Sequence, residues 1–156
     1  MSDEKIPLSK QLNIPPVWLI GALLIMWFWH SVLPIVKFGG LASKTVGALM
    51  IVAAMALAIF SIVQFQKADT PVHPRRKPTT LLTDGLYQYS RNPIYLAMVT
   101  LAFGAALCFG SIGALIPVIA LFWVLQDLFI AGEEHHIEQN FGDEWRSYAA
   151  KTRRWI

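Results

Sequence analysis

The chain has few of the residues on which small secreted proteins and metal centres depend. Of its 156 residues one is cysteine, Cys108, and four are histidine. A single thiol excludes an intramolecular disulfide scaffold. The sequence EEHH at residues 133–136 contains the Glu-x-x-His half-motif of a carboxylate-bridged iron pair, but the chain has no second copy. We therefore expect no metal site.

Charge is also scarce. Charged residues make up 15% of the chain and hydrophobic residues 55%, whereas soluble domains have an apolar share of about 45–50%. Two runs of twenty residues, 17–36 and 46–65, are long enough to cross the roughly 30 Å hydrocarbon layer. The first has mixed flanking charge and exceeds a signal-peptide core, so we expect a retained helix. Small residues in the second are typical of close helix packing.

A third apolar region, residues 94–125, contains no charged residue. As one helix it would measure about 48 Å at about 1.5 Å per residue, which is too long for a bilayer. Gly110 and Ser111 near its middle favour a turn. We predict two short spans, 93–109 and 112–131, joined as a tight antiparallel hairpin. The expected fold class is an all-α polytopic membrane protein with four transmembrane helices in a single domain, residues 1–156.

Lysine and arginine are distributed unevenly among the predicted loops. Two precede the first span, five lie between the second and third, and four follow the fourth, against two in the first loop and none at the 110–111 turn. The positive-inside rule then predicts that both termini are cytoplasmic. The formal charge of +3 fits anionic lipid head groups and requires no nucleic-acid partner. We expect the plasma (inner) membrane of a prokaryote.

Polar residues collect after Gly132. The spacing of apolar residues predicts a cytoplasmic helix over 133–140, a break at Gly142 and a short amphipathic helix whose basic, aromatic end lies on the membrane surface.

The predicted hairpin brings polar groups that are distant in sequence to one end of the bundle. A turn centred between residues 110 and 111 places Asn92 and Pro93 opposite residues 128–129, and Tyr87 level with Glu134. Asn92 is a favourable helix N-cap and Pro93 a favourable first residue. Their helix would present free N–H groups and a positive dipole end beside Arg91, an arrangement that suits a carboxylate.

The predicted exit of the fourth span adds acidic residues, and aromatic residues flank both segments. The acids are Asp127, Glu133 and Glu134, and the aromatic residues are Tyr87, Tyr95 and Trp145. S-adenosylmethionine has a carboxylate, a diol, an aromatic base and a cationic sulfonium, which match these groups. We therefore expect a cofactor region over 79–95 and 127–154. Membrane anchoring and lipid binding are the alternative interpretation of the same residues.

The sequences GLYQYSRNPIY, EE and FGDEWRSY resemble the isoprenylcysteine carboxyl methyltransferase and phospholipid methyltransferase superfamily, whose signature is Gly-x-Tyr-x-x-x-Arg-His-Pro-x-Tyr followed by Glu-Glu. The resemblance covers residues 79–154. The matching residues are Gly85, Tyr87, Arg91, Pro93, Tyr95, Glu133 and Glu134. Asn92 stands where the family most often has histidine. Asparagine still donates hydrogen bonds, but it cannot transfer a proton.

The resemblance implies an integral membrane methyltransferase that takes S-adenosylmethionine from the cytosol and a lipophilic acceptor from the bilayer. It implies that Arg91 and Glu134 are catalytic. The implied cofactor-binding residues are Gly85, Tyr87, Arg91, Asn92, Pro93, Tyr95, Glu133 and Glu134.

The acceptor stays open between an isoprenylcysteine carboxylate-like and a phospholipid amine-like group. Methyl transfer by in-line displacement needs positioning more than a metal. A carboxylate acceptor needs no base, whereas an amine must lose a proton, for which Glu134 or His136 is a candidate.

Three other classes are compatible with the sequence. A small four-helix exporter would need an ionisable group at depth, and Asp127 is the only candidate. A reductase-like relative would use NADPH, although such chains are much longer. A non-catalytic membrane adaptor would keep the fold without the chemistry.

Overall fold

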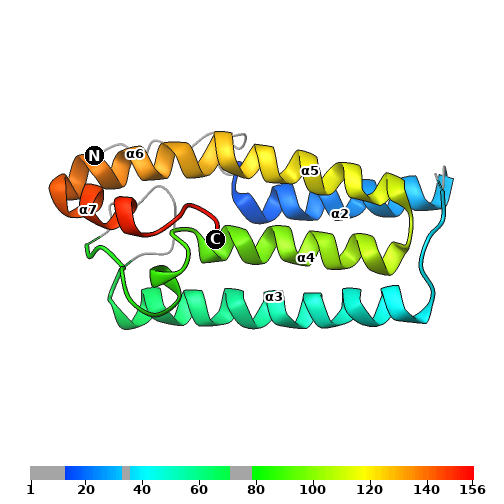
Figure 1. The fold of residues 1–156 in the computed structure, drawn as a ribbon. Helices are drawn as coiled ribbons and strands as arrows, with labels where there is room; N and C mark the ends of the chain where they lie inside the picture. The colour runs from blue at the N-terminus through cyan, green and yellow to red at the C-terminus, as the bar shows by residue number, and fades with distance from the viewer. Residues whose placement is uncertain (1–12, 33–35, 71–78) are drawn as a thin grey trace, which may run out of the picture.

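The protein is described here by a computed structural model that covers residues 13–32, 36–70 and 79–156. Helices α2 (Pro15–Val32), α3 (Leu41–Lys67) and α4 (Pro93–Phe109) run side by side with a longer helical rod (Figure 1). That rod passes through the 3-10 turn η2 (Ile112–Ala114), α5 (Leu115–Val124), the π-helical η3 (Leu125–Ile130) and α6 (Ala131–Phe141). Gly142 separates it from α7 (Asp143–Lys151).

The fold is all-helical over the described residues, as predicted, apart from one isolated bridge between Lys37 and Ser111. Three helices are long and apolar enough to cross a membrane: Pro15–Val32, Leu41–Lys67 and Ile112–Phe141. Helix α4, with 17 residues, is a shorter apolar helix. The count of four spans therefore remains a prediction. So does the orientation, because several of the basic residues on which it rests lie outside the described residues.

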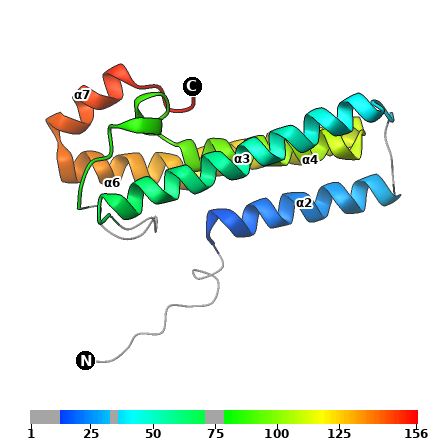
Figure 2. The ribbon, with the colours of Figure 1, turned by 90° about the horizontal axis from the view of Figure 1, so that it is seen from below.

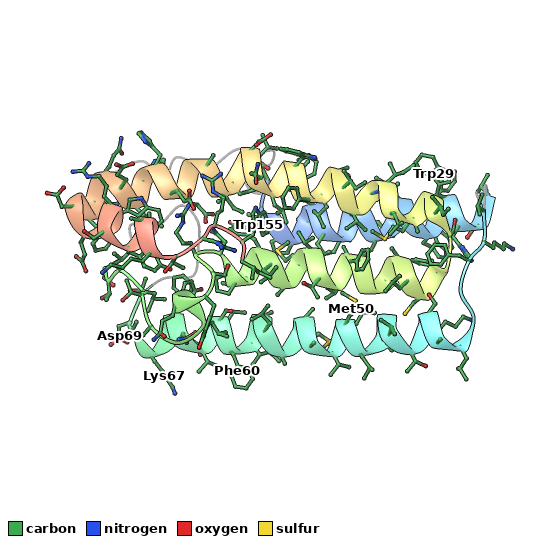
Figure 3. The ribbon with its side chains drawn as sticks, viewed as in Figure 1. Trp29, Met50, Phe60, Lys67, Asp69 and Trp155 are labelled. Atoms are coloured by element: carbon green, nitrogen blue, oxygen red, sulfur yellow. The ribbon has the colours of Figure 1, made fainter. Side chains whose placement is uncertain are left out.

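Helix α4 lies at the centre of the bundle and packs against α2, α3 and α5. Figure 2 shows α2 set apart from α3, with α4 beside α3. Many large apolar side chains on the outer faces of α2 and α3 are exposed, and Phe60 points away from the other helices (Figure 3). An outer surface this apolar fits a hydrocarbon surrounding.

The contact between α3 and α4 is close because glycines face each other across it. A β-carbon added to Gly104 would lie 2.7 Å from the carbonyl oxygen of Gly47. Ser43 Oγ donates a hydrogen bond to the carbonyl of Leu107 at 2.8 Å. The close packing predicted for the small residues of the second span is confirmed, since Gly47, Ala54 and Ser61 are the buried residues of α3.

The reversal after α4 occupies more residues than predicted. Gly110 ends α4 with a φ of 63°, and the chain then passes through Ser111 and the η2 turn before α5 begins. The centre of the reversal therefore lies beyond the predicted point between 110 and 111. The predicted register is wrong by several residues, because Tyr95 meets Glu133 and Arg91 meets Glu134.

A second correction concerns the end of the fourth span. The predicted span 112–131 and the predicted helix 133–140 form one continuous helix that ends at Phe141. Gly132 does not interrupt it, because a glycine inside a helix costs only about 0.5–1 kcal/mol relative to alanine. The π-helical turn η3, with hydrogen bonds from residue i to i+5, has more residues per turn than an α-helix and so changes the faces on which Glu133 and Glu134 lie.

Candidate active site

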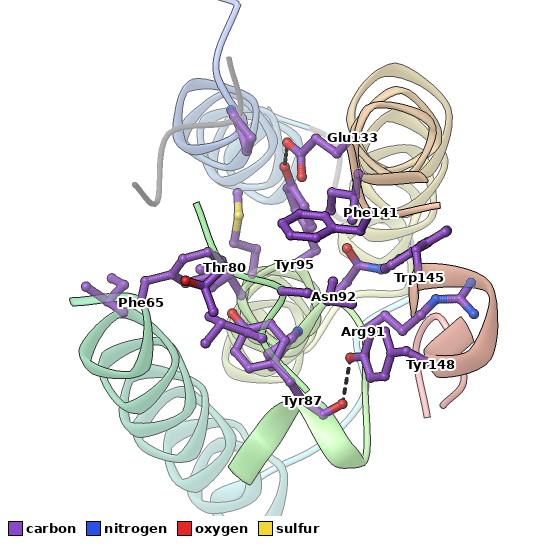
Figure 4. A pocket seen from close by; sticks show the side chains of 18 of the residues that line it. Phe65, Thr80, Tyr87, Arg91, Asn92, Tyr95, Glu133, Phe141, Trp145 and Tyr148 are labelled. Carbon is purple, nitrogen blue, oxygen red and sulfur yellow. Dashed lines mark hydrogen bonds between the residues drawn. The ribbon is translucent and has the colours of Figure 1, made fainter. Parts of the chain in front are cut away.

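A pocket of about 460 Å³ lies at the end of the bundle where α4 begins (Figure 4). Ligand pockets in proteins typically have volumes of about 300–1,000 Å³. Its walls come from the start of α2, the end of α3, residues 80–82, Tyr87, residues 91–95, Met98, α6 and α7. The lining is mainly apolar. Its polar or amphipathic members are Thr80, Tyr87, Arg91, Asn92, Tyr95, Glu133, Trp145 and Tyr148.

A 3-10 turn, η1 (Gly85–Gln88), fixes Tyr87 in the pocket wall. Gly85 has a φ of 60°, which is strained for other residues, and a β-carbon there would displace the Gln64 amide. Gln64 holds the turn from α3, because its amide donates to the carbonyl of Asp84 at 3.1 Å and accepts from the N–H of Leu86 at 3.2 Å. Gly85 thus supports the site without lining it.

Helix α4 begins where the sequence predicts it, but its N-cap side chain does not form the expected capping hydrogen bond. Pro93 is the first residue of the helix and Asn92 the N-cap residue. The Asn92 side chain makes no capping hydrogen bond. Its Nδ2 group instead donates to Glu134 Oε1 at 3.4 Å and to the carbonyl of Arg154 at 3.2 Å. The side chain therefore ties the start of α4 to two later segments of the chain.

Arg91 lines the pocket, but its guanidinium is committed to protein partners. Its Nε donates to Glu134 Oε1 at 3.0 Å, and its Nη1 donates to the carbonyls of Ala149 and Thr152 at 2.9 and 3.0 Å. The side chain is 13% exposed. Because those two carbonyls lie at the end of α7, Arg91 neutralises the negative end of that helix.

Glu134 and Glu133 are neighbours in sequence with different surroundings. Glu134 is paired with Arg91 and Arg154 and does not line the pocket. Glu133 lines the pocket and accepts a 2.5 Å hydrogen bond from Tyr95 Oη (Figure 4). Asp127, which the sequence placed in the same acidic wall, is exposed and is not part of the lining.

Helix α7 contributes an aromatic wall. The Tyr148 hydroxyl donates to the carbonyl of Tyr87 at 2.6 Å, and the Arg91 guanidinium carbon lies 5.5 Å from the centre of the Trp145 ring. Burial raises the pKa of Tyr148 to about 12 and also raises the pKa of Tyr87, so both phenols stay neutral at physiological pH. The sequence had suggested Trp145, but it missed Tyr148 and Phe141. Their helical spacing with Trp145 was the available signal.

The model of the phospholipid methyltransferase family matches residues 42–144, which is well over half of the chain. The chain belongs to the phospholipid methyltransferase family. The matched residues include nearly all of α3, all of α4, and Glu133 and Glu134. Most of α7 and residues 152–156 lie outside the match.

Two curated proteins resemble this phospholipid methyltransferase family member. An uncharacterized protein of Haemophilus influenzae is 36% identical over 63 residues, which are 40% of this chain and 100% of that protein. Protein-S-isoprenylcysteine O-methyltransferase of Schizosaccharomyces pombe is 30% identical over 78 residues, which are 50% of this chain and 33% of that protein. The chain thus matches about a third of the length of the yeast enzyme. No solved structure matches the chain.

The pocket brings together most of the residues that the sequence singled out. Six of the eight predicted cofactor-binding residues line it, while Gly85 and Glu134 stand behind the wall. His136, a candidate base, is exposed and does not line it. Within the described ranges, His, Cys, Asp and Glu side chains do not gather in groups of three that could hold a metal ion.

Proposed function

We propose that this phospholipid methyltransferase family member is an integral membrane enzyme that transfers a methyl group from S-adenosylmethionine to a lipophilic acceptor at the cytosolic membrane interface. The observation that carries the proposal is the pocket, in which the family's signature residues meet an aromatic wall and an apolar wall. The yeast relative's name, which specifies O-methylation of a protein S-isoprenylcysteine, supports a lipophilic acceptor.

The lining residues fit S-adenosylmethionine group by group. The aromatic faces of Tyr87, Trp145 and Tyr148 would attract a sulfonium cation and stack with an adenine ring. The carboxylate of Glu133 would accept hydrogen bonds from a ribose diol. The first turn of α4, in which the N–H groups of Ile94 and Tyr95 have no acceptor within the helix, would face the carboxylate of the amino acid part.

When bound, S-adenosylmethionine supplies an activated methyl group together with its own leaving group. The protein then has to orient donor and acceptor and exclude water, which can supply most of the rate enhancement. Apolar side chains from three helices, Ile14 and Pro15 near the start of α2, Phe65 of α3 and Met98 of α4, would hold the apolar part of the acceptor.

A proton acceptor is required only if the acceptor is an amine. Of the candidates that the sequence offered, Glu134 is paired with two arginines and His136 is outside the lining. Glu133 is the carboxylate that faces the pocket in the described part of the chain, so we assign the base role for an amine acceptor to Glu133. Arg91 and Glu134 then hold the wall of the site in place.

The proposal includes a topology of four spans in one membrane-embedded unit, with α4 as a short central span and the pocket on the cytosolic side of a prokaryotic inner membrane. In its support, α7 and the end of α3 lie at the pocket end of the bundle (Figure 1). Lys37 and Lys44 lie at the other end, where Lys37 pairs with Ser111 and the Lys44 carbonyl contacts Cys108.

The proposal is tested by titrating detergent-solubilised protein with S-adenosylmethionine, S-adenosylhomocysteine and NADPH. We expect both adenosyl ligands to bind and NADPH not to bind. Lys37→Ala, at the opposite end of the bundle, should bind them with wild-type affinity. Absence of binding by both adenosyl ligands would overturn the proposed function, and binding of NADPH alone would favour a reductase.

A further inference from the structure

Residues 152–156 follow α7 and run back over the start of α4 (Figure 1). The N–H of Arg91 donates to the carbonyl of Arg153 at 2.9 Å. The carbonyl of Arg154 accepts from Asn92 Nδ2 at 3.2 Å and from Ser90 Oγ at 3.4 Å. This segment, which we call the strap (residues 152–156), thus lies along residues 90–92, of which Arg91 and Asn92 line the pocket.

The strap also completes an ion-pair network behind that wall. Glu134 Oε1 accepts from Arg91 Nε, and Glu134 Oε2 accepts from Arg154 Nε at 3.1 Å and Nη2 at 2.6 Å. The Glu134 side chain is 11% exposed, so each of its oxygens depends on a protein donor. Without Arg154, Glu134 Oε2 would lose both of its donors. The carboxylate would then compete with the carbonyls of Ala149 and Thr152 for the guanidinium of Arg91.

Trp155 anchors the strap to the membrane-spanning part of the bundle (Figure 3). Its ring stacks on Phe122 with a centroid distance of 4.7 Å and an angle of 28° between planes. Its Nε1 donates to Gln126 Oε1 at 3.0 Å. The side chain next to Arg154 is therefore fixed to α5 and η3, which limits the positions that the Arg154 guanidinium can adopt.

We propose that Arg154 is a positioning residue of the cofactor pocket: through Glu134, and held by the Trp155 anchor, it fixes Arg91 and Asn92 in the pocket wall. This inference rests on the proposed function. It concerns residues 152–156, which lie outside the segment that the family model matches. Arg154 is not among the lining residues, so its effect on the ligand is indirect. The strap would thereby couple the pocket to a membrane-spanning helix.

The test compares S-adenosylmethionine affinity in five variants of the full chain. Arg154→Gln should weaken binding about tenfold, which corresponds to about 1.4 kcal/mol. Arg154→Lys should recover part of the loss, since lysine keeps the charge but not the two-pronged geometry. Trp155→Phe, which keeps the stacking, should bind more tightly than Trp155→Ala. Arg153→Gln is the matched control, because among the described residues that side chain reaches only the carbonyl of Ile156, at 3.5 Å.

Hydrogen exchange at the Arg91 amide gives a second readout that needs no cofactor. We expect Arg154→Gln to speed exchange there and to leave the middle of α3 unchanged. Wild-type affinity and wild-type exchange in Arg154→Gln would overturn the inference and leave the proposed function standing. A wild-type protein that binds no adenosyl ligand would overturn the proposed function itself. If Arg154→Gln does not fold, Arg154→Lys decides, and wild-type affinity in that variant would overturn the inference.

Discussion

Replacing Arg91 with alanine should release α7 from the pocket, whereas the same replacement of Arg146 should not. Each arginine side chain makes three hydrogen bonds, those of Arg146 being to Asp143 and Glu138. The difference is burial, since the Arg91 side chain is 13% exposed and that of Arg146 is 60% exposed. Solvent-exposed ion pairs contribute little, because water and salt screen them.

The expected loss of free energy in Arg91→Ala follows from the groups that lose their hydrogen-bond donor. Two carbonyls at the end of α7 lose their charged donor, and hydrogen bonds to charged groups contribute about 1.5–3 kcal/mol each. Glu134 keeps Arg154 as a partner, so its loss is partial. We expect the free energy of opening α7 to fall by about 3–5 kcal/mol, in the range for breaking a buried ion pair.

Hydrogen exchange of residues 143–151 in detergent or nanodiscs measures this opening free energy directly. Arg91→Ala should speed exchange across α7 by orders of magnitude while α3 keeps its protection. Arg146→Ala should exchange like the wild type. Equal behaviour of the two variants would show that Arg91 does not hold α7, and our account of the pocket wall would be refuted.

Three further predictions concern the charge, the packing and the pH response of the same molecule. Glu133→Gln, which keeps an acceptor for Tyr95, should weaken binding of S-adenosylmethionine and of S-adenosylhomocysteine alike by about tenfold, about 1.4 kcal/mol, because both carry the ribose diol assigned to Glu133; wild-type affinity for both in calorimetric titration would contradict that contact. Gly104→Leu should destabilise the bundle by about 1–3 kcal/mol in thermal unfolding, because its β-carbon would lie 2.7 Å from the Gly47 oxygen; an unchanged unfolding midpoint would contradict the close contact. Burial raises the pKa of Tyr148 to about 12, so the folded state holds a proton that the unfolded state releases near pH 10, and stability should fall as the pH rises from about 10 towards 12. Tyr148→Phe should make stability fall less steeply with pH over this range, and an unchanged pH dependence would rule out a buried phenol.

The sequence predicted α4 to the residue because both of its ends carry strong local signals. Asn92 and Pro93 mark the beginning, and Gly110, with a positive φ, marks the end. The same holds for the break at Gly142 between α6 and α7. Such signals depend on the conformational limits of single residues, so a sequence displays them directly.

The register between α4 and α6 could not be predicted in this way. The η2 turn and the π-helical η3 shift the two helices relative to each other. The η3 segment contains no proline or glycine, and Gly113 in η2 does not reveal how many residues the reversal takes. The roles of Glu133 and Glu134 depend on this register, because it decides which carboxylate faces the pocket and which faces Arg91.

The wall formed by α7 was missed for a different reason. The bonds from Arg91 to the end of α7 join residues 58 and 61 positions apart in the chain. The amphipathic pattern of α7 predicts that one face is covered, but it does not say whether lipid or protein covers it. We predicted Trp145 for the pocket and the basic end of the helix for the membrane surface, but not Tyr148; both aromatic side chains are buried and line the pocket.

The most direct test of the central claim is to find where the methyl donor binds. A photoreactive analogue of S-adenosylhomocysteine, crosslinked to the protein in nanodiscs and mapped by peptide mass spectrometry, should label residues 80–98 and 133–148 and should be displaced by S-adenosylmethionine. Labelling concentrated near residues 36–44 or 110–114, at the other end of the bundle, would contradict the account.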